Sequence, residues 1–186
     1  MIDRNTNYEI MEEIKERWSP RAFSTERVPM EDVMAILEAA RFAPSCFNEQ
    51  PWRFIVGHNA ETREKIFSLL GEPNQVWAEK APVLMIVLAK KTFDYNGKEN
   101  FWHMFDSGIA GGYLSLEAQR RGYITHGMGG FNKKGTIELF ELGDDIQPIA
   151  AIALGKMGSK EDLPEDLRHR EEPAGRNSLD SLILFE

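Results

Sequence analysis

The sequence predicts one domain that mixes helices and strands, of the α+β or α/β class, with three or four strands. Segments with helical spacing of apolar residues alternate with short strand-like runs, and 42% of the 186 residues are hydrophobic. The clearest strand is Val83–Ala89, a continuous apolar run bounded by Pro82 and Lys90, which is typical of a strand buried on both faces. A chain of this length supports one sizeable core, so we expect a single domain over residues 1–186.

The other elements follow in order along the chain. Apolar residues at helical spacing predict helices over residues 7–16, 30–42, 61–70, 100–120 and near 134–142. Strand-like runs lie at residues 52–57, 123–126 and 147–154. Pro44 ends the second helix, and Gly71 and Pro73 end the third. Residues 158–175 are charged and contain two prolines, so we expect an extended surface segment there, followed by an apolar patch at 179–185.

The composition argues against several classes of function and partner. The chain has 22 Lys and Arg against 30 Asp and Glu, a net charge of −8, so we expect no nucleic-acid partner. A single cysteine, Cys46, excludes an intramolecular disulfide, and we expect no metal site and a reducing, cytoplasmic location. The N-terminus has no apolar signal core, and no apolar run approaches the roughly twenty residues of a membrane helix, so we expect no membrane partner.

The helix predicted over residues 100–120 carries several glycines in its middle: Gly108, Gly111 and Gly112. Each interior glycine costs about 1 kcal/mol relative to alanine, and close approach of another backbone would offset that cost. The helices also contain more apolar surface than so few strands can cover. We therefore expect the remainder to be buried in a homodimer.

Most standard catalytic signatures are absent. The chain contains no HExxH, CxxC, GxxxxGK[ST] or GxSxG, and its glycine-rich GMGGF lacks the spacing of a dinucleotide fingerprint. The four histidines are scattered, which is typical of structural or surface positions. A nucleophilic role for Cys46 would need a base and an orienting group, and the sequence identifies neither.

The one distinctive constellation lies between Arg17 and Phe54. Arg17, Ser19 and Arg21 occupy alternate positions of the segment RWSPR, which in an extended chain lie on one side and suit an anion such as phosphate. Solvated charge after a helix end is the more ordinary interpretation of such a pair. The turn that follows the second helix, PSCFNEQ, is dense in small and amide side chains and suits a polar heteroaromatic edge.

These motifs resemble those of a known family. RWSPRAFS followed by ILEAARFAPSCFNEQPWRFIV resembles the opening of the nitroreductase family of FMN-dependent oxidoreductases. The resemblance continues through NQVWAEKAPVLMIV, DSGIAGGYLSLEAQRRGY, HGMGGFN and IAAIALGK, and covers nearly the whole chain. It implies an α+β, three-layer fold with a central mixed or antiparallel sheet flanked by helices. It also implies an intertwined homodimer with FMN sites at the subunit interface.

The resemblance assigns one set of residues to the flavin of one active site. Arg17, Ser19 and Arg176 would hold the FMN phosphate, and Arg21 would lie at the N1/C2 carbonyl edge and stabilise the reduced flavin. Trp18 replaces the usual second basic residue, and it either weakens phosphate binding or supplies a stacking surface.

A second set completes the site. The resemblance places Pro44, Ser45, Cys46 and Asn48 against the flavin of the partner subunit. The remaining assigned residues are Asn74 and the weaker candidate Gln75 at the polar edge, Gly129 and Gly130 whose backbone approaches flavin N5, and Gly127 and Met128 beside them. Trp77 stands where some members carry a lysine near the flavin.

The implied activity is hydride transfer from NAD(P)H through flavin N5 to a nitroaromatic, quinone or similar acceptor by a ping-pong mechanism. No side chain need act as acid or base, because the cofactor carries the chemistry. Two kinds of alternative remain open: reductive dehalogenation, enone reduction or flavin destruction on the same scaffold, and a non-enzymatic flavin-binding protein. Aromatic residues at 93, 95, 101 and 102 are equally compatible with covering a planar substrate and with ordinary packing.

Overall fold

The structure is a computed structural model that describes residues 4 and 6–185. Its centre is a four-stranded sheet of the order β1-β2-β4-β3, in which every neighbouring pair is antiparallel. The strands are β1 Trp52–Gly57, β2 Val83–Lys90, β3 Ile124–Met128 and β4 Ile146–Gly155. The sheet expected to be mixed or antiparallel is therefore antiparallel throughout.

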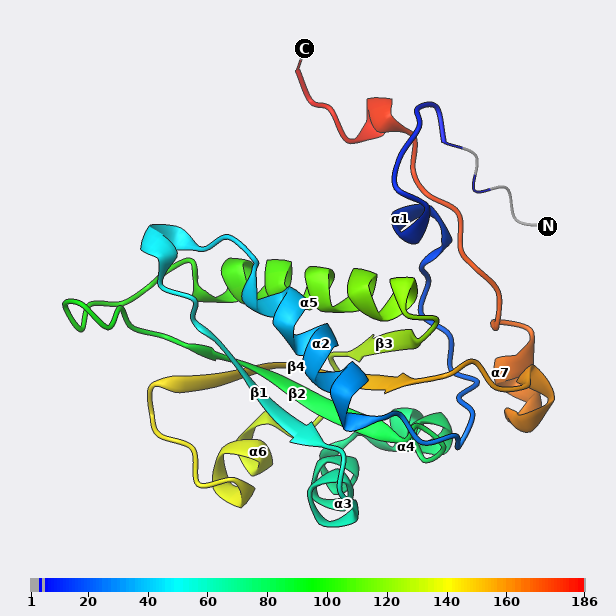
Figure 1. The fold of residues 1–186 in the computed structure, drawn as a ribbon, viewed down its shortest axis with the longest axis horizontal. Helices are drawn as coiled ribbons and strands as arrows, with labels where there is room; N and C mark the ends of the chain where they lie inside the picture. Colours follow the sequence, from blue (N-terminus) through cyan, green and yellow to red (C-terminus); the bar gives the residue numbers. More distant parts are fainter. Residues whose placement is uncertain (1–3, 5, 186) are drawn as a thin grey trace.

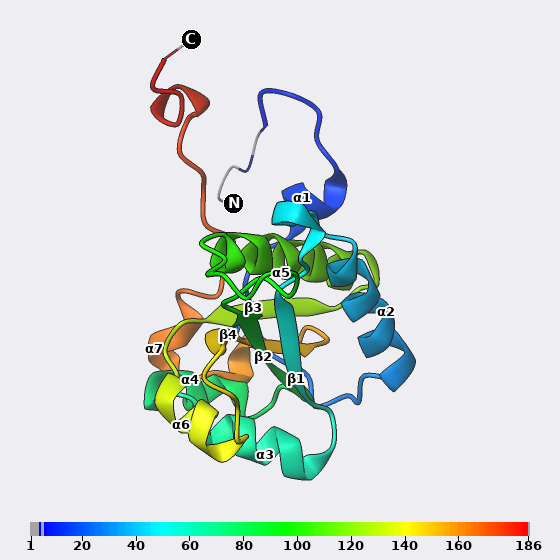
Figure 2. The same ribbon diagram turned by 90° about the vertical axis from the view of Figure 1, so that its left-hand side faces the viewer.

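Helices cover both faces of this sheet. Figure 1 shows α2 (Met30–Arg41) and α5 (His103–Arg120) on one face, and α3 (Ala60–Leu69), α4 (Glu72–Ala78) and α6 (Lys133–Leu139) on the other. The turned view in Figure 2 keeps the same three layers. The remaining helical segments are α1 Glu12–Glu16, α7 Glu165–Arg168, and the 3-10 turns η1 Cys46–Asn48, η2 Lys160–Asp162 and η3 Leu179–Ser181. The predicted α+β, three-layer fold is confirmed.

The apolar run at residues 83–89 forms the centre of two cores. Alternate side chains of a strand point to opposite faces of its sheet. Val83, Met85 and Val87 therefore pack with α2 and α5 in one cluster. Leu84, Ile86 and Leu88 pack with α3 and α4 in the other. The run is continuous because β2 is central and covered on both faces, although its neighbours are antiparallel.

The length of one predicted helix and the role assigned to one proline were wrong. The helix expected over residues 7–16 is confined to α1, whose residues are all at least partly exposed. Without packing against the core, so short a segment does not offset the cost of nucleating a longer helix. Pro73 was expected to end a helix with Gly71, but it lies in the first turn of α4, a position where proline is favoured.

The segment from residue 158 to 175 also differs from the prediction of an extended surface chain. It forms η2 and α7, and it buries Leu163 and Glu171 against the rest of the molecule. The apolar side chains that follow at positions 179 and 182–185 are exposed, which leaves an apolar terminal segment without a partner in the described chain.

The glycines of α5 do not contact another backbone within the described part of the chain, so the expected close approach is not made there. A Cβ added at Gly108, Gly111 or Gly112 would meet no atom within 4 Å. The large apolar side chains Phe105 and Tyr113 on the same helix are exposed. The outer face of α5 therefore combines exposed apolar side chains with glycines, and nothing in the described chain covers it at these glycines. Among the described residues, no helix is both long enough and apolar enough to cross a membrane.

Candidate functional site

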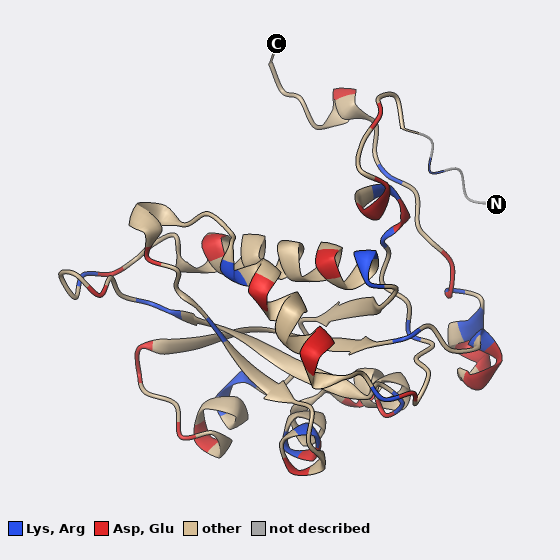
Figure 3. Cartoon of the chain, in the orientation of Figure 1, with Lys and Arg blue, Asp and Glu red and all other residues tan. Residues whose placement is uncertain are grey.

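Three arginines gather near the end of the molecule that holds both termini. Arg17 follows α1 and is half-buried, and its Nη1 donates to the hydroxyl oxygen of Ser19 at 3.3 Å. Burial lowers the pKa of Arg17, and the positive charges of Arg176 and Arg4 lower that pKa further. Figure 3 marks basic positions along the chain segment after α1 at this end of the molecule.

These guanidinium groups lack acidic partners within the described residues. None of the ion pairs found there includes Arg4, Arg17 or Arg176. Guanidinium donors are well matched to phosphate oxygens, and like charges placed together favour an anion between them. The structure therefore brings together three of the predicted phosphate-binding residues: Arg17, Ser19 and Arg176.

Arg4 is a member of this cluster that sequence reasoning missed. Its guanidinium donates to the carbonyl oxygens of Glu16 and Arg17, each at 3.2 Å. The positive charge of Arg176 contributes to lowering the pKa of Arg4, after burial. No sequence motif identifies Arg4 as a member of the cluster, because its contact with α1 depends on how the N-terminal segment folds back.

Arg21 has different neighbours from Arg17, although even spacing predicted that the two would lie on one side. Arg21 borders a cavity of about 370 Å³ together with Trp77, Lys80 and Leu163. The candidate site therefore has two cationic parts. One surrounds Arg17 and Ser19, and the other is at Arg21.

Two side chains that are distant in the sequence, those of Glu171 and His126, hold the backbone between the Arg17–Ser19 pair and Arg21. Glu171 Oε1 accepts from the amides of Arg21 and Ala22 at 2.7 and 2.8 Å. His126 Nδ1 lies 2.9 Å from the carbonyl oxygen of Pro20, to which it donates when it carries the ring proton. The backbone of residues 20–22 is thus fixed from both sides.

Trp77 belongs to the core rather than to an open flavin face. It is 3% exposed, and its ring lies 6.1 Å from that of Phe23 and 4.4 Å from that of His126. The Trp77 indole packs against the His126 ring, so Trp77 contributes to the site through packing.

The glycine-rich segment begins inside the sheet. β3 extends through Met128, so Gly127 and Met128 are strand residues, and the Met128 side chain is buried. Gly127 and Gly129 border open space, where a Cβ would meet nothing within 4 Å. The backbone at these two glycines is therefore accessible to a ligand.

Asn74 and Gly130 lie together, whereas Gln75 serves the fold. The Asn74 side-chain amide donates to the Gly130 carbonyl at 2.9 Å. That carbonyl also accepts from the Gly71 amide at 2.9 Å. The Gln75 amide donates to the Phe67 carbonyl of α3 at 3.1 Å, which fastens α4 to α3.

The predicted second half of the site is a strained turn beside α5. Phe47, Asn48 and Gln50 have φ values of 51°, 58° and 51°, in the left-handed region. The Cys46 amide donates to Asp106 Oδ2 at 3.0 Å, and Asp106 is 3% exposed. Such a turn persists only where surrounding contacts determine it.

This turn borders a second cavity. Pro44, Ser45 and Cys46 line a space of about 250 Å³ with the side chains of α5 and the turn before it: Trp102, Phe105, Asp106 and Ile109. The Ser45 hydroxyl oxygen accepts from the Gln50 amide at 2.9 Å, which closes the turn on itself. Asn48 is exposed at its tip.

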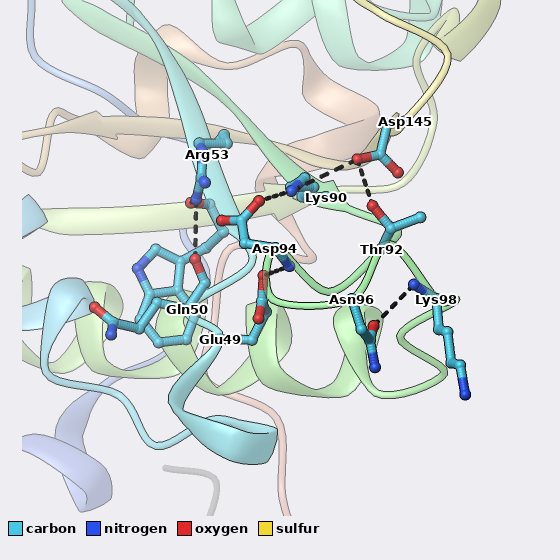
Figure 4. Close-up of polar contacts among 10 residues, drawn as sticks. Glu49, Gln50, Arg53, Lys90, Thr92, Asp94, Asn96, Lys98 and Asp145 are labelled. Carbon is cyan, nitrogen blue, oxygen red and sulfur yellow. Dashed lines mark hydrogen bonds and ion pairs between the residues drawn. The ribbon is translucent and has the colours of Figure 1, made fainter.

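A hairpin at residues 91–99 supports the same turn from the other side. Figure 4 shows Glu49, whose carboxylate accepts from the Asp94 amide at 2.7 Å. Asp94 in turn pairs with Lys90 at the end of β2. Thr92 donates to Asp145 at 2.8 Å, which joins the hairpin to the start of β4. The turn is therefore held by both α5 and the sheet.

The two halves of the predicted site lie at opposite ends of α5 (Figure 1). Asp106, which holds the turn, is in the first turn of this helix, whereas the Arg17 segment lies beyond its C-terminal end. A helix of 18 residues is about 27 Å long. One chain therefore does not bring Pro44–Asn48 to Arg17.

Because burial lowers the pKa of His126, the His126 ring binds a proton less readily in the folded protein than in the unfolded chain. Arg21 also lowers that pKa, whereas Glu171 and the Pro20 carbonyl raise it. Stability should therefore be full above about pH 6.5, the ordinary histidine pKa, and should fall below it. In urea unfolding between pH 7 and 5, the wild type should lose more stability than His126→Asn, which keeps a donor near Pro20. Equal losses would show that His126 is not buried as a neutral ring.

Comparisons with known proteins identify the family of this chain. A family model described as nitroreductase family matches residues 14–76 and 68–156. A protein of Methanothermobacter thermautotrophicus, provisionally named an NADH dehydrogenase/NAD(P)H nitroreductase, is 32% identical over 79% of this chain and 76% of its own. The FMN reductase [NAD(P)H] of Bacillus subtilis is 28% identical over 94% of this chain and 78% of its own.

A solved structure described as an oxidoreductase containing FMN has a TM-score of 0.93 and 37% identity, and the match covers 97% of this chain and 93% of that one. The family model spans well over half of the sequence, including the segments that carry Arg17, the Pro44 turn and β4. The chain belongs to the nitroreductase family.

Proposed function

We propose that this protein is an FMN-dependent oxidoreductase that uses NAD(P)H. One observation carries the proposal: the guanidinium groups that gather around Arg17 and Ser19 have no acidic partner among the described residues. The FMN reductase relative and the FMN-containing structural neighbour support the same cofactor.

The residues present fit a flavin phosphate at one end and a polar ring edge at the other. Arg17, Ser19 and Arg176 would hold the phosphate through charge-assisted hydrogen bonds. Arg21, which borders its own cavity, would place a fixed positive charge at the pyrimidine edge and favour the reduced form. Trp18, half-buried between Arg17 and Ser19, lies where a stacking surface is possible.

The other edge would rest on α4 and the glycine-rich segment. Asn74 uses its amide group on Gly130, so its Oδ1 is available to a ligand donor. The open backbone at Gly129 allows the ring to approach closely. FMN held here would supply the hydride chemistry, so the side chains would need only to bind and orient it and to exclude water.

We propose further that two chains complete each site. Pro44, Ser45, Cys46 and Asn48 lie too far along α5 to serve the flavin bound at Arg17 of the same chain. The uncovered outer face of α5 and the apolar segment at residues 179–185 offer an apolar surface for a second copy. A homodimer covers that surface and places the turn of one chain at the flavin of the other.

A nitroaromatic, quinone or similar planar acceptor is the substrate class we favour. The hairpin and turn present an aromatic cluster in which the ring of Phe93 lies 5.9 Å from Phe47 and 5.3 Å from Tyr95. Phe47 and Tyr95 are largely exposed, so they are available to cover a planar ring. Steady-state rates with nitro, quinone, enone and halogenated aromatic acceptors distinguish the activities that one scaffold of this kind supports.

Arg17→Ala and Arg176→Ala should each weaken FMN binding roughly ten- to a hundredfold, because a charge-assisted contact contributes about 1.5–3 kcal/mol. The measurement is quenching of flavin fluorescence on titration of the apoprotein. Arg170→Ala removes an exposed positive charge from the same segment and should leave the affinity unchanged. The wild-type complex should be yellow and should bleach with NADH or NADPH without oxygen. Wild-type protein that cannot be loaded with FMN would overturn the proposal.

Gly112→Arg should produce a monomer that binds FMN poorly, because the new side chain occupies the proposed interface, whereas its Cβ would meet no atom of its own chain within 4 Å. Gly143→Arg is the matched control, since it too points into open space. Sedimentation equilibrium should give twice the chain mass of 21.2 kDa for the wild type and for Gly143→Arg. A dimer that persists in Gly112→Arg with full FMN content would contradict the role of α5.

A further inference from the structure

Glu171 is a buried carboxylate that joins two segments far apart in the sequence. It is 7% exposed, and its Oε1 accepts hydrogen bonds from the backbone amides of Arg21 and Ala22 at 2.7 and 2.8 Å. The bonds connect the C-terminal segment to the segment that contains Arg17 and Ser19. They are the shorter, stronger kind that form between a backbone donor and a charged acceptor.

This arrangement is an expensive way to hold a backbone in place. A buried carboxylate loses its hydration, and only its hydrogen bonds offset the loss. Glu171 Oε2 is buried and has no hydrogen-bond partner among the described residues. An apolar side chain in the same space would leave the amides of Arg21 and Ala22 without an acceptor, so the carboxylate fixes the backbone of these two residues in one conformation.

Glu171 is also the last buried residue before Arg176. Along the described chain from residue 172 to 185, every residue is exposed except Pro173, which is partly buried. Among the described residues, the Arg176 side chain donates hydrogen bonds only to its own neighbours, the carbonyl oxygens of Ala174 and Gly175. Its placement beside Arg17 therefore depends on where the chain leaves Glu171.

The same bonds determine the orientation of the other segment. Residues 20–22 are held by Glu171 on one side and by His126 on the other. Ser19 and Arg17 directly precede this fixed stretch, and their side chains contact each other at 3.3 Å. Glu171 thus helps to position both the Arg17–Ser19 segment and the segment that carries Arg176.

We propose that Glu171 is a positioning residue for the phosphate site: it brings the Arg17–Ser19 segment and Arg176 to the same anion. The inference rests on the proposed function, since the anion is taken to be the phosphate of FMN. Glu171 itself does not touch the phosphate, because its oxygens are buried against the backbone. It acts by making the two halves of the cluster converge.

The test compares binding of FMN and riboflavin to dimeric apoprotein. The two flavins share the ring system, and only FMN carries the phosphate. Loss of convergence should lower FMN affinity more than riboflavin affinity, because only FMN has a phosphate for Arg17 and Arg176, whereas general loosening of the fold should weaken both flavins equally. Glu171→Ala removes the acceptor, and Glu171→Gln keeps one carbonyl oxygen for the two amides. Glu172→Ala is the matched control, because its neighbouring carboxylate is exposed.

In Glu171→Ala, the preference for FMN over riboflavin should fall by about tenfold or more, the factor that corresponds to about 1.4 kcal/mol. Glu171→Gln should restore most of this preference, and Glu172→Ala should match the wild type. A double variant with Arg176→Ala should lose little beyond Glu171→Ala alone, because the arginine is already misplaced.

An unchanged preference for FMN in Glu171→Ala would overturn the inference. So would equal weakening of both flavins, which would indicate a structural role only. If Glu171→Ala does not fold, amide hydrogen exchange in the Glu171→Gln apoprotein tests the inference instead. Arg21 and Ala22 should remain protected there, and rapid exchange at both with normal FMN preference would contradict the proposal. Failure of the wild type to bind FMN would instead refute the proposed function.

Discussion

Arg17 and Arg176 carry like charges and lie near each other, with Arg4 beside them and no carboxylate paired to any of the three within the described residues. Such groups repel, so the fold must hold them together until an anion binds between them. This constraint explains features that packing alone does not. Arg17 is half-buried, its neighbours Pro20 to Ala22 are held by the buried Glu171 and the partly buried His126, and the C-terminal segment is anchored shortly before Arg176.

The three-layer core supplies the rigidity that this arrangement needs. β2 is packed on both faces, and its neighbour β4 pairs with β3, which carries His126 and leads into the glycine-rich segment. α5 separates the cation cluster from the Cys46 turn. Within this framework a single chain can hold a phosphate and one ring edge, and the second chain that we propose would supply the opposite wall. The same proposal would explain the glycines of α5, because positions without side chains allow two helices to approach closely.

Much of the fold could be predicted because its signals are local. The strand at Trp52–Gly57 has the predicted bounds, and the buried run at Val83 differs by a single residue at its end. The role of Pro73 was predicted wrongly because a proline can end one helix or begin the next, and the contacts that stabilise α4, such as that of Trp77 with His126, are not local in sequence. The short α1 shows the converse, since apolar spacing without a core to face does not make a long helix.

The site was predictable in part for the same reason. Arg17 and Ser19 belong to a local motif, whereas Arg4, Glu171 and His126 matter only through contacts across the chain. The Glu171 bonds to residues 21 and 22 span about 150 positions, and no spacing rule reveals such a contact. Gln75, a flavin candidate by position, is committed to the Phe67 carbonyl, which sequence position alone does not show.

The most direct test of the central claim is phosphorus NMR of bound FMN as a function of pH. A phosphate monoester in water takes up its second proton near pH 6. If the cluster around Arg17 and Arg176 surrounds this group, the bound phosphate should stay dianionic well below pH 6, with a chemical shift that barely changes. A bound FMN whose phosphate titrates as it does in free solution would contradict the account.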